Sequence, residues 1–109
     1  MLNSQPTEKE LLKAVLEPLL EDFQYWFGRS RSLLEKEDLP FFQPSEQLSL
    51  LERVKTAQQE VSTAQLLYQT TGAGIEPSIL VPWHQLVTEC WGVASRWRSF
   101  KEKEREQNP

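Results

Sequence analysis

The residues that could do chemistry in this 109-residue chain are few. Its one histidine, His84, and its one cysteine, Cys90, lie six residues apart, a spacing that does not place two side chains side by side on a helix. A structural zinc site needs four nitrogen or sulfur ligands, and a nucleophilic cysteine needs a base beside it. We therefore expect no metal site and no cofactor, and we expect Cys90 to be a core thiol.

The carboxylates and glycines give no stronger signal. Glu17, Glu21 and Asp22 fall on a helix flank with no facing histidine, which is typical of a solvated surface rather than an acid–base pair. Gly72 and Gly74 lack the lysine and the preceding strand that a phosphate-binding loop requires. The sequence predicts no catalytic residues, and we expect a protein that is not an enzyme.

Tryptophan is the residue type that this chain uses heavily. Three of its four tryptophans lie in the last third of the chain, as Trp83, Trp91 and Trp97. Their steps of eight and six cannot all fall on one line of a helix, so we expect two in the core and one half-exposed. The alternative is that one of them, with Arg96 or Arg98 beside it, anchors another protein, because Trp and Arg are enriched at the centres of interfaces.

Phe41 and Phe42 are a second aromatic feature, bracketed by Pro40 and Pro44. The pair either caps the end of a helical bundle or offers an exposed anchor. The predicted partner contacts are Phe41, Phe42, Trp83, Trp91, Arg96, Trp97 and Arg98.

The first of three expected helices is announced by Thr7 and Glu10, a capping-box pair. Apolar residues then alternate at steps of four and three to about Glu37, and Pro18 either kinks this helix or starts its main part. The predicted line of contact is Leu12, Leu16, Leu19, Phe23, Trp26 and Leu33.

The second helix is expected to follow Ser45 as N-cap and to end at Gly72 and Gly74. Its predicted line of contact is Leu50, Val54, Ala57, Val61, Ala64 and Tyr68. Residues 76–82 are expected to connect it to a third helix that begins at Pro82 and uses Gly92 for a close contact.

Three long amphipathic helices with short connections predict an all-α fold, an up-down-up antiparallel bundle with heptad-like seams. We expect a disordered N-terminus over residues 1–7, the bundle over 8–100 and a charged, fraying tail over 101–109. In this arrangement Trp26 is expected to meet Trp97 and Phe100 at one end of the bundle.

Composition narrows the classes of partner. The net charge is −4, and the bases near the C-terminus alternate with glutamates, so nucleic acid is a poor candidate. No signal peptide and no stretch of 18 apolar residues is evident, and a single cysteine fits a reducing compartment. We expect a cytoplasmic protein with at most peripheral membrane contact.

Four strings of the sequence, Leu16–Phe27, Arg29–Glu35, Val54–Gln65 and Pro82–Trp91, together resemble a family of short, uncharacterised cyanobacterial proteins. The resemblance covers about residues 8–98. It implies a cyanobacterial source, an intracellular setting and a connection with photosynthetic physiology, but no activity for particular residues.

An aromatic surplus without chemistry predicts a helical adaptor or assembly factor that binds another protein. One alternative is a homo-oligomer in which a second copy completes the regular seam of the second helix. A further alternative is attachment to a membrane surface through the tryptophans and bases of the third helix.

Overall fold

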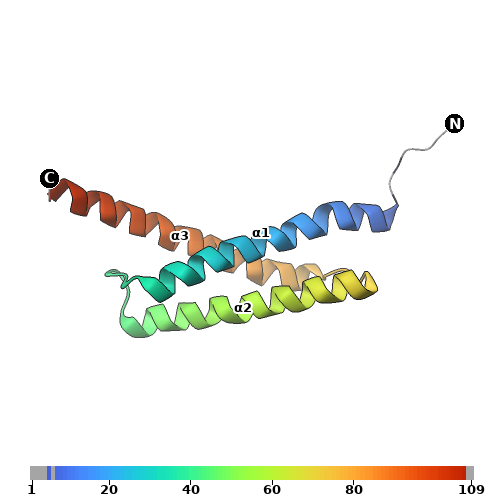
Figure 1. Cartoon of the computed structure of the whole chain (residues 1–109), viewed down its shortest axis with the longest axis horizontal. Coiled ribbons are helices and arrows are strands. Elements are labelled where there is room, and N and C mark those ends of the chain that lie inside the picture. The colour runs from blue at the N-terminus through green and yellow to red at the C-terminus, as the bar shows by residue number, and fades with distance from the viewer. Residues whose placement is uncertain (1–4, 6, 108–109) are drawn as a thin grey trace.

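The computed structural model describes residue 5 and residues 7–107. Over these residues the chain forms three helices and no strand: α1 (Glu8–Lys36), α2 (Pro44–Thr71) and α3 (Pro77–Gln107). They run up, down and up, with α1 and α2 paired as a hairpin and α3 crossing α1 (Figure 1). The molecule is elongated, 68 × 30 × 20 Å. The predicted all-α three-helix bundle is confirmed.

Helix α1 begins as predicted, because the side-chain oxygen of Thr7 accepts a hydrogen bond from the backbone N–H of Glu10 at 3.1 Å. Pro18 lies inside one continuous helix, so it does not start the main segment. The buried line of α1 differs from the predicted one and comprises Leu16, Leu20, Phe23, Phe27 and Leu34.

Leu19, Trp26 and Leu33, placed on this line by the sequence, are only partly buried. The physical reason is that α1 packs against two helices, so its most buried line runs between them. Trp26, for example, lies on the flank that faces α3.

Helix α2 begins two residues earlier than predicted. Gln43, not Ser45, is the N-cap, and its backbone N–H donates to the Glu46 carboxylate at 2.8 Å, while Pro44 takes the first helical position. Gly72 ends the helix in the left-handed conformation with φ 71°, and its N–H donates to the carbonyl of Tyr68 at 2.8 Å. The predicted line is confirmed: Leu50, Val54, Ala57 and Val61 are buried, and Ala64 and Tyr68 are partly buried.

Helix α3 begins at Pro77, so Pro82 lies inside the helix and most of the expected connection is helical. Pro77 is the proline at the helix start, where a missing N–H costs nothing. The close contact expected at Gly92 is wrong, since a methyl group there would find nothing within 4 Å. The predicted tail is helical and exposed to Gln107, and residues 108–109 lie outside the described part.

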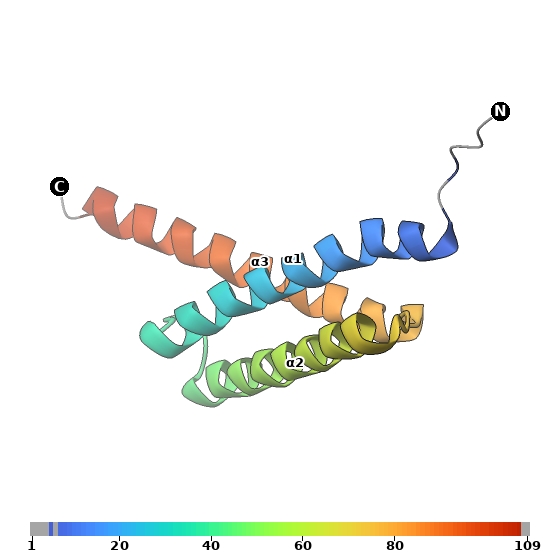
Figure 2. The ribbon, with the colours of Figure 1, turned by 45° about the vertical axis from the view of Figure 1, so that its right-hand side comes forward.

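Helix α1 is the centre of the core. The backbone of α1 approaches both other helices, whereas α2 and α3 come close to each other at few points. The last buried residue of α3 is Val93, and residues 94–107, the arm, run out past the α1–α2 hairpin (Figures 1 and 2). The fold therefore leaves a trough between α2 and α3 and a helical arm at one end.

Candidate interaction surfaces

Trp83, one of the predicted contacts, is a core residue. Its side chain is only 4% exposed, and its ring meets that of Phe23 edge to face at 5.6 Å between centroids. The indole N–H donates to a carboxylate oxygen of Glu60 at 3.0 Å. Because the ring is enclosed and its one polar group is satisfied, Trp83 is a core residue and not an exposed anchor, and this prediction is corrected.

Trp91 lies at the surface and is 44% exposed. Its ring meets Trp26 edge to face at 5.5 Å, and Trp26 meets Tyr25 in the same way at 5.1 Å. Tyr25 is itself 54% exposed, and its hydroxyl accepts a hydrogen bond from Arg29 at 3.0 Å. We call Tyr25, Trp26 and Trp91 the tryptophan ridge; two rigid helices hold its rings in a fixed arrangement.

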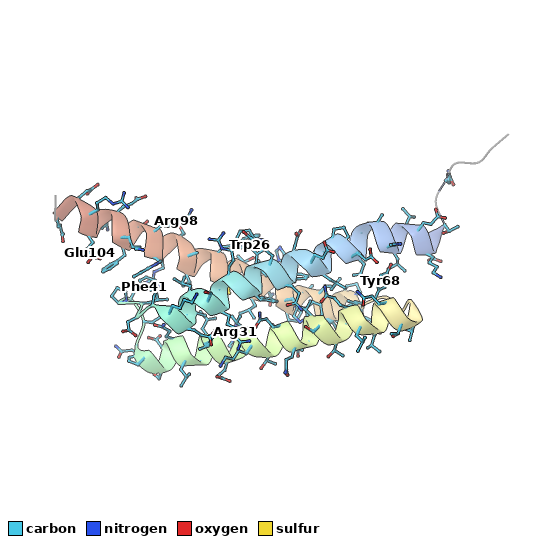
Figure 3. The ribbon with its side chains drawn as sticks, viewed as in Figure 1. Trp26, Arg31, Phe41, Tyr68, Arg98 and Glu104 are labelled. Carbon is cyan, nitrogen blue, oxygen red and sulfur yellow. The ribbon has the colours of Figure 1, made fainter. Side chains whose placement is uncertain are left out.

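The expectation that Trp26 meets Trp97 and Phe100 is wrong. Helix α3 crosses α1 at an angle instead of running beside it, so the partner of Trp26 is Trp91. Arg98 is exposed and follows Trp91 by seven residues, two turns of helix, so both side chains share one face of α3. Figure 3 shows Trp26 and Arg98 along the same edge of the molecule.

Phe41 and Phe42 lie in the α1–α2 connection, half-buried, with their ring centroids 5.2 Å apart. The guanidinium of Arg96 lies 4.2 Å from the centroid of Phe41, a cation–π contact. We call these three residues the phenylalanine corner. Arg96 and Arg98 thus belong to different surfaces, which their spacing of two residues on a helix requires.

One side chain of α2 fixes the connection that carries the corner. The Gln47 amide donates to the carbonyls of Leu34 and Glu37 at 2.9 and 2.7 Å, and its oxygen accepts from the N–H of Leu39 at 3.1 Å. Because these bonds satisfy backbone groups at the end of α1, the phenylalanines are held by an ordered turn.

Trp97 and Phe100 form the apolar part of the arm. Their rings stack with centroids 5.6 Å apart, and the Lys101 ammonium lies 5.3 Å from the Trp97 centroid. Trp97 is half-buried and Phe100 is exposed. Trp97 packs in part against the core, so the exposed portion of this apolar stack, with its basic neighbour, is provided mainly by Phe100.

The prediction that Cys90 is a core thiol is confirmed, since its side chain is 3% exposed. Burial raises the pKa of this thiol, and the nearby Ser30 opposes the change only in part. His84 is exposed. Among the described residues, no three of His, Cys, Asp and Glu are grouped closely enough to hold a metal ion.

The trough between α2 and α3 consists of two adjoining hollows of about 690 and about 800 Å³. They share the lining residues Thr56, Glu60, Pro82 and Trp83. Sequence reasoning missed this feature, because the trough exists only where two helices fail to pack on each other.

Sequence reasoning also missed Tyr25, Trp26 and Arg29 as surface residues. A signal for them was present: Tyr25 and Trp26 are adjacent, and neighbours on a helix point about 100° apart, so the pair spans more than one line of contact.

None of the three helices, over the residues that the structure describes, has the length and apolar character of a membrane span.

Comparison with known proteins identifies the family. The family model described as a protein of unknown function, DUF2605, matches residues 6–99, so the chain belongs to this family. No curated protein and no solved structure matches the chain. The predicted membership of an uncharacterised family is confirmed, and the cyanobacterial source stays a prediction.

Proposed function

We propose that this member of the DUF2605 family is a non-enzymatic helical adaptor or assembly factor that binds another protein through the tryptophan ridge. The supporting observation is the exposed ring of Trp91, held edge to face by the half-buried Trp26 beside the exposed Tyr25. Rings already fixed in position lose little conformational entropy on binding, and Trp and Tyr are the residues that dominate binding energy at interfaces.

Charge indicates the chemistry of the partner. Arg29 hydrogen-bonds Tyr25 at one side of the ridge, and Arg98 lies two turns along α3 from Trp91. The two guanidinium groups thus lie beside the apolar rings of the ridge. A complementary partner surface would be an apolar patch with carboxylates at its edge. We infer that the protein works in the cytoplasm of a cyanobacterium, so the partner should be sought there.

The deciding experiment is capture by the tagged protein from soluble and membrane fractions of a cyanobacterial lysate. The wild-type chain and the variants Trp91→Ala and Arg98→Glu are compared with Leu66→Ala, an exposed apolar residue on the outer side of α2. We expect one partner with Leu66→Ala and wild type, and affinity about tenfold lower or worse with Trp91→Ala, which corresponds to about 1.4 kcal/mol. Circular dichroism checks that each variant stays helical.

Equal capture by all four proteins would contradict the ridge as the binding surface. The same variants, tested by flotation with anionic liposomes, distinguish a membrane from a protein. Flotation that Trp91→Ala abolishes would replace the protein partner by a lipid surface. A Phe42→Ser variant tests the phenylalanine corner as a second contact in the same assay.

The regular seam of α2 no longer motivates a second copy that completes it, because Leu50, Val54 and Val61 are already buried within the chain. Self-association therefore depends on a different surface.

A further inference from the structure

The trough has a shape that admits a helix. Its lining on α2 is made of small residues, the buried Ala57 and the partly buried Ala64 together with Thr56 and Thr63. Small residues let the backbone of a neighbouring helix approach closely. The exposed Leu67 and Ile79 lie along the same trough and supply apolar surface.

The charge of the trough is negative. Its lining contains Glu52, Glu60 and Glu76. The basic residue in the lining, Arg53, is held by Glu89 through two hydrogen bonds of 3.0 and 2.8 Å. Glu52 is paired with Lys55 at 3.7 Å, so the negative charge of the trough rests on Glu60 and Glu76. A helix that fills the trough should therefore be apolar on one side and basic beside it.

The arm of the same chain has this chemistry. It carries the stacked rings of Trp97 and Phe100. The arm, residues 94–107, contains five basic residues and three acidic ones, a net charge of +2, which is opposite in sign to the charge of the trough lining.

The two features lie on the same side of α3. Pro82 lines the trough, and Phe100 follows it by 18 residues, which is five full turns of an α-helix, about 27 Å along the axis. The trough therefore occupies one half of this side and the arm the other. An antiparallel second α3 would place each arm in the trough of the other copy, and one two-fold axis would generate both contacts.

We propose that two copies of this chain form a two-fold dimer in which the arm of each copy, residues 94–107, occupies the trough between α2 and α3 of the other. The occupant is a second copy because the acidic trough and the basic, aromatic arm are both present in one chain and lie on the same side of α3, which reciprocal exchange requires. In the dimer each arm becomes a fourth helix packed on α2 and α3 of the other copy.

This dimer leaves the tryptophan ridge free. Trp91 follows Pro82 by nine residues, two and a half turns, so it points to the opposite side of α3. A dimer would present two ridges, which makes the proposed adaptor bivalent. The dimer itself does not depend on the proposed function, because the two use opposite sides of α3.

The test is the molar mass of the purified full chain by analytical ultracentrifugation over a wide concentration range, at low and at high salt. We expect a reversible dimer of twice 12.7 kDa that dissociates at lower concentration and more readily at high salt. A chain that stays monomeric throughout would overturn the proposal.

Charge-reversal variants test the mode of exchange. The trough variant carries Glu52→Lys and Glu76→Lys, and the arm variant carries Lys101→Glu and Lys103→Glu, the two basic residues nearest to Phe100 on its C-terminal side. We expect each alone to dimerise at least tenfold more weakly, and their mixture to form a heterodimer, because both arm–trough contacts then pair opposite charges. The control, Lys9→Glu with Lys13→Glu at the exposed start of α1, should dimerise like wild type.

The apolar part of the contact is tested by Phe100→Ser, which should also favour the monomer without loss of helix. The arm-in-trough arrangement would be overturned if the trough variant and the arm variant each dimerised like wild type. It would also be overturned if their mixture formed no heterodimer. Trp91→Ala should dimerise like wild type. Loss of partner capture with an intact dimer, or the converse, therefore separates failure of the proposed function from failure of this dimer.

Discussion

Cys90 shows how the position of a side chain on its helix decides what its chemistry can do. The thiol lies on the buried line of α3, and the exposed His84 is not beside it to act as a base. A thiol without solvent or a base stays protonated and unreactive. The same argument separates Trp83 from Trp91: one lies on the buried line and one beside it, so only Trp91 presents an exposed ring.

A pH dependence of stability follows from this burial. Burial raises the pKa of the folded Cys90 thiol, whereas the unfolded thiol titrates near about 8.5. The unfolded chain therefore loses this proton first, so the contribution of Cys90 to stability is complete below about pH 8.5 and falls as pH rises above it. We expect the free energy of unfolding, measured in urea, to decrease between pH 8 and pH 10.

The control for this prediction is Cys90→Ala, which should be less stable at every pH but lose less stability over the same interval. Identical slopes for the two proteins would contradict a buried, protonated thiol. Labelling with a maleimide provides a second readout, since the native thiol should react far more slowly than the thiol in urea.

At the scale of the helices, periodicity and caps predicted the elements well. Thr7 and Gly72 mark their helix ends in both sequence and structure, because each provides a local hydrogen bond or backbone conformation that needs no tertiary partner. The incorrect predictions, the start of α3 and the buried line of α1, concern features that depend on how the helices pack on one another. Pro77 and Pro82 are equally good helix starts by local rules, and the shift from Trp26 to Phe27 on α1 depends on having two neighbours rather than one.

The candidate surfaces were less predictable for the same reason. Spacing alone showed that Trp83, Trp91 and Trp97 could not share one line, but which of them is exposed depends on the angle at which α3 crosses α1. The pairing of Arg96 with Phe41 required the position of the α1–α2 connection. The trough could not be predicted, because it is defined by the low contact between α2 and α3.

Two glycines provide a matched test of backbone conformation. A methyl group would find nothing within 4 Å at Gly72 or at Gly92, so steric contact is equal at both sites. Only Gly72 has a positive φ, of 71°, whereas Gly92 lies inside a regular helix. We expect Gly72→Ala to lower the free energy of unfolding by about 1 kcal/mol, and Gly92→Ala to raise it by at most about 1 kcal/mol. Thermal unfolding of all three proteins at the same concentration measures both changes. Changes of the same sign would contradict this account.

For the whole molecule, the central position of α1 creates an uneven distribution of stability. Helices α2 and α3 both pack on α1, so the buried residues of α3 end at Val93 and the arm has no tertiary contact of comparable depth. Local opening is easiest where few apolar contacts must break. The arm of an isolated chain should therefore fray while the crossing of α1 and α3 stays closed.

Hydrogen exchange of backbone amides measures this difference directly. In a dilute sample we expect amides around Leu86 and Cys90 to exchange only by global unfolding, and amides beyond Trp97 to exchange orders of magnitude faster. At high concentration a dimer with exchanged arms should slow the arm amides of the wild-type chain, because a trough now covers them, and should leave those of Phe100→Ser unchanged. Strong protection of the arm in the dilute sample would contradict the uneven distribution. Protection that rises equally in both proteins would place the contact between copies away from Phe100.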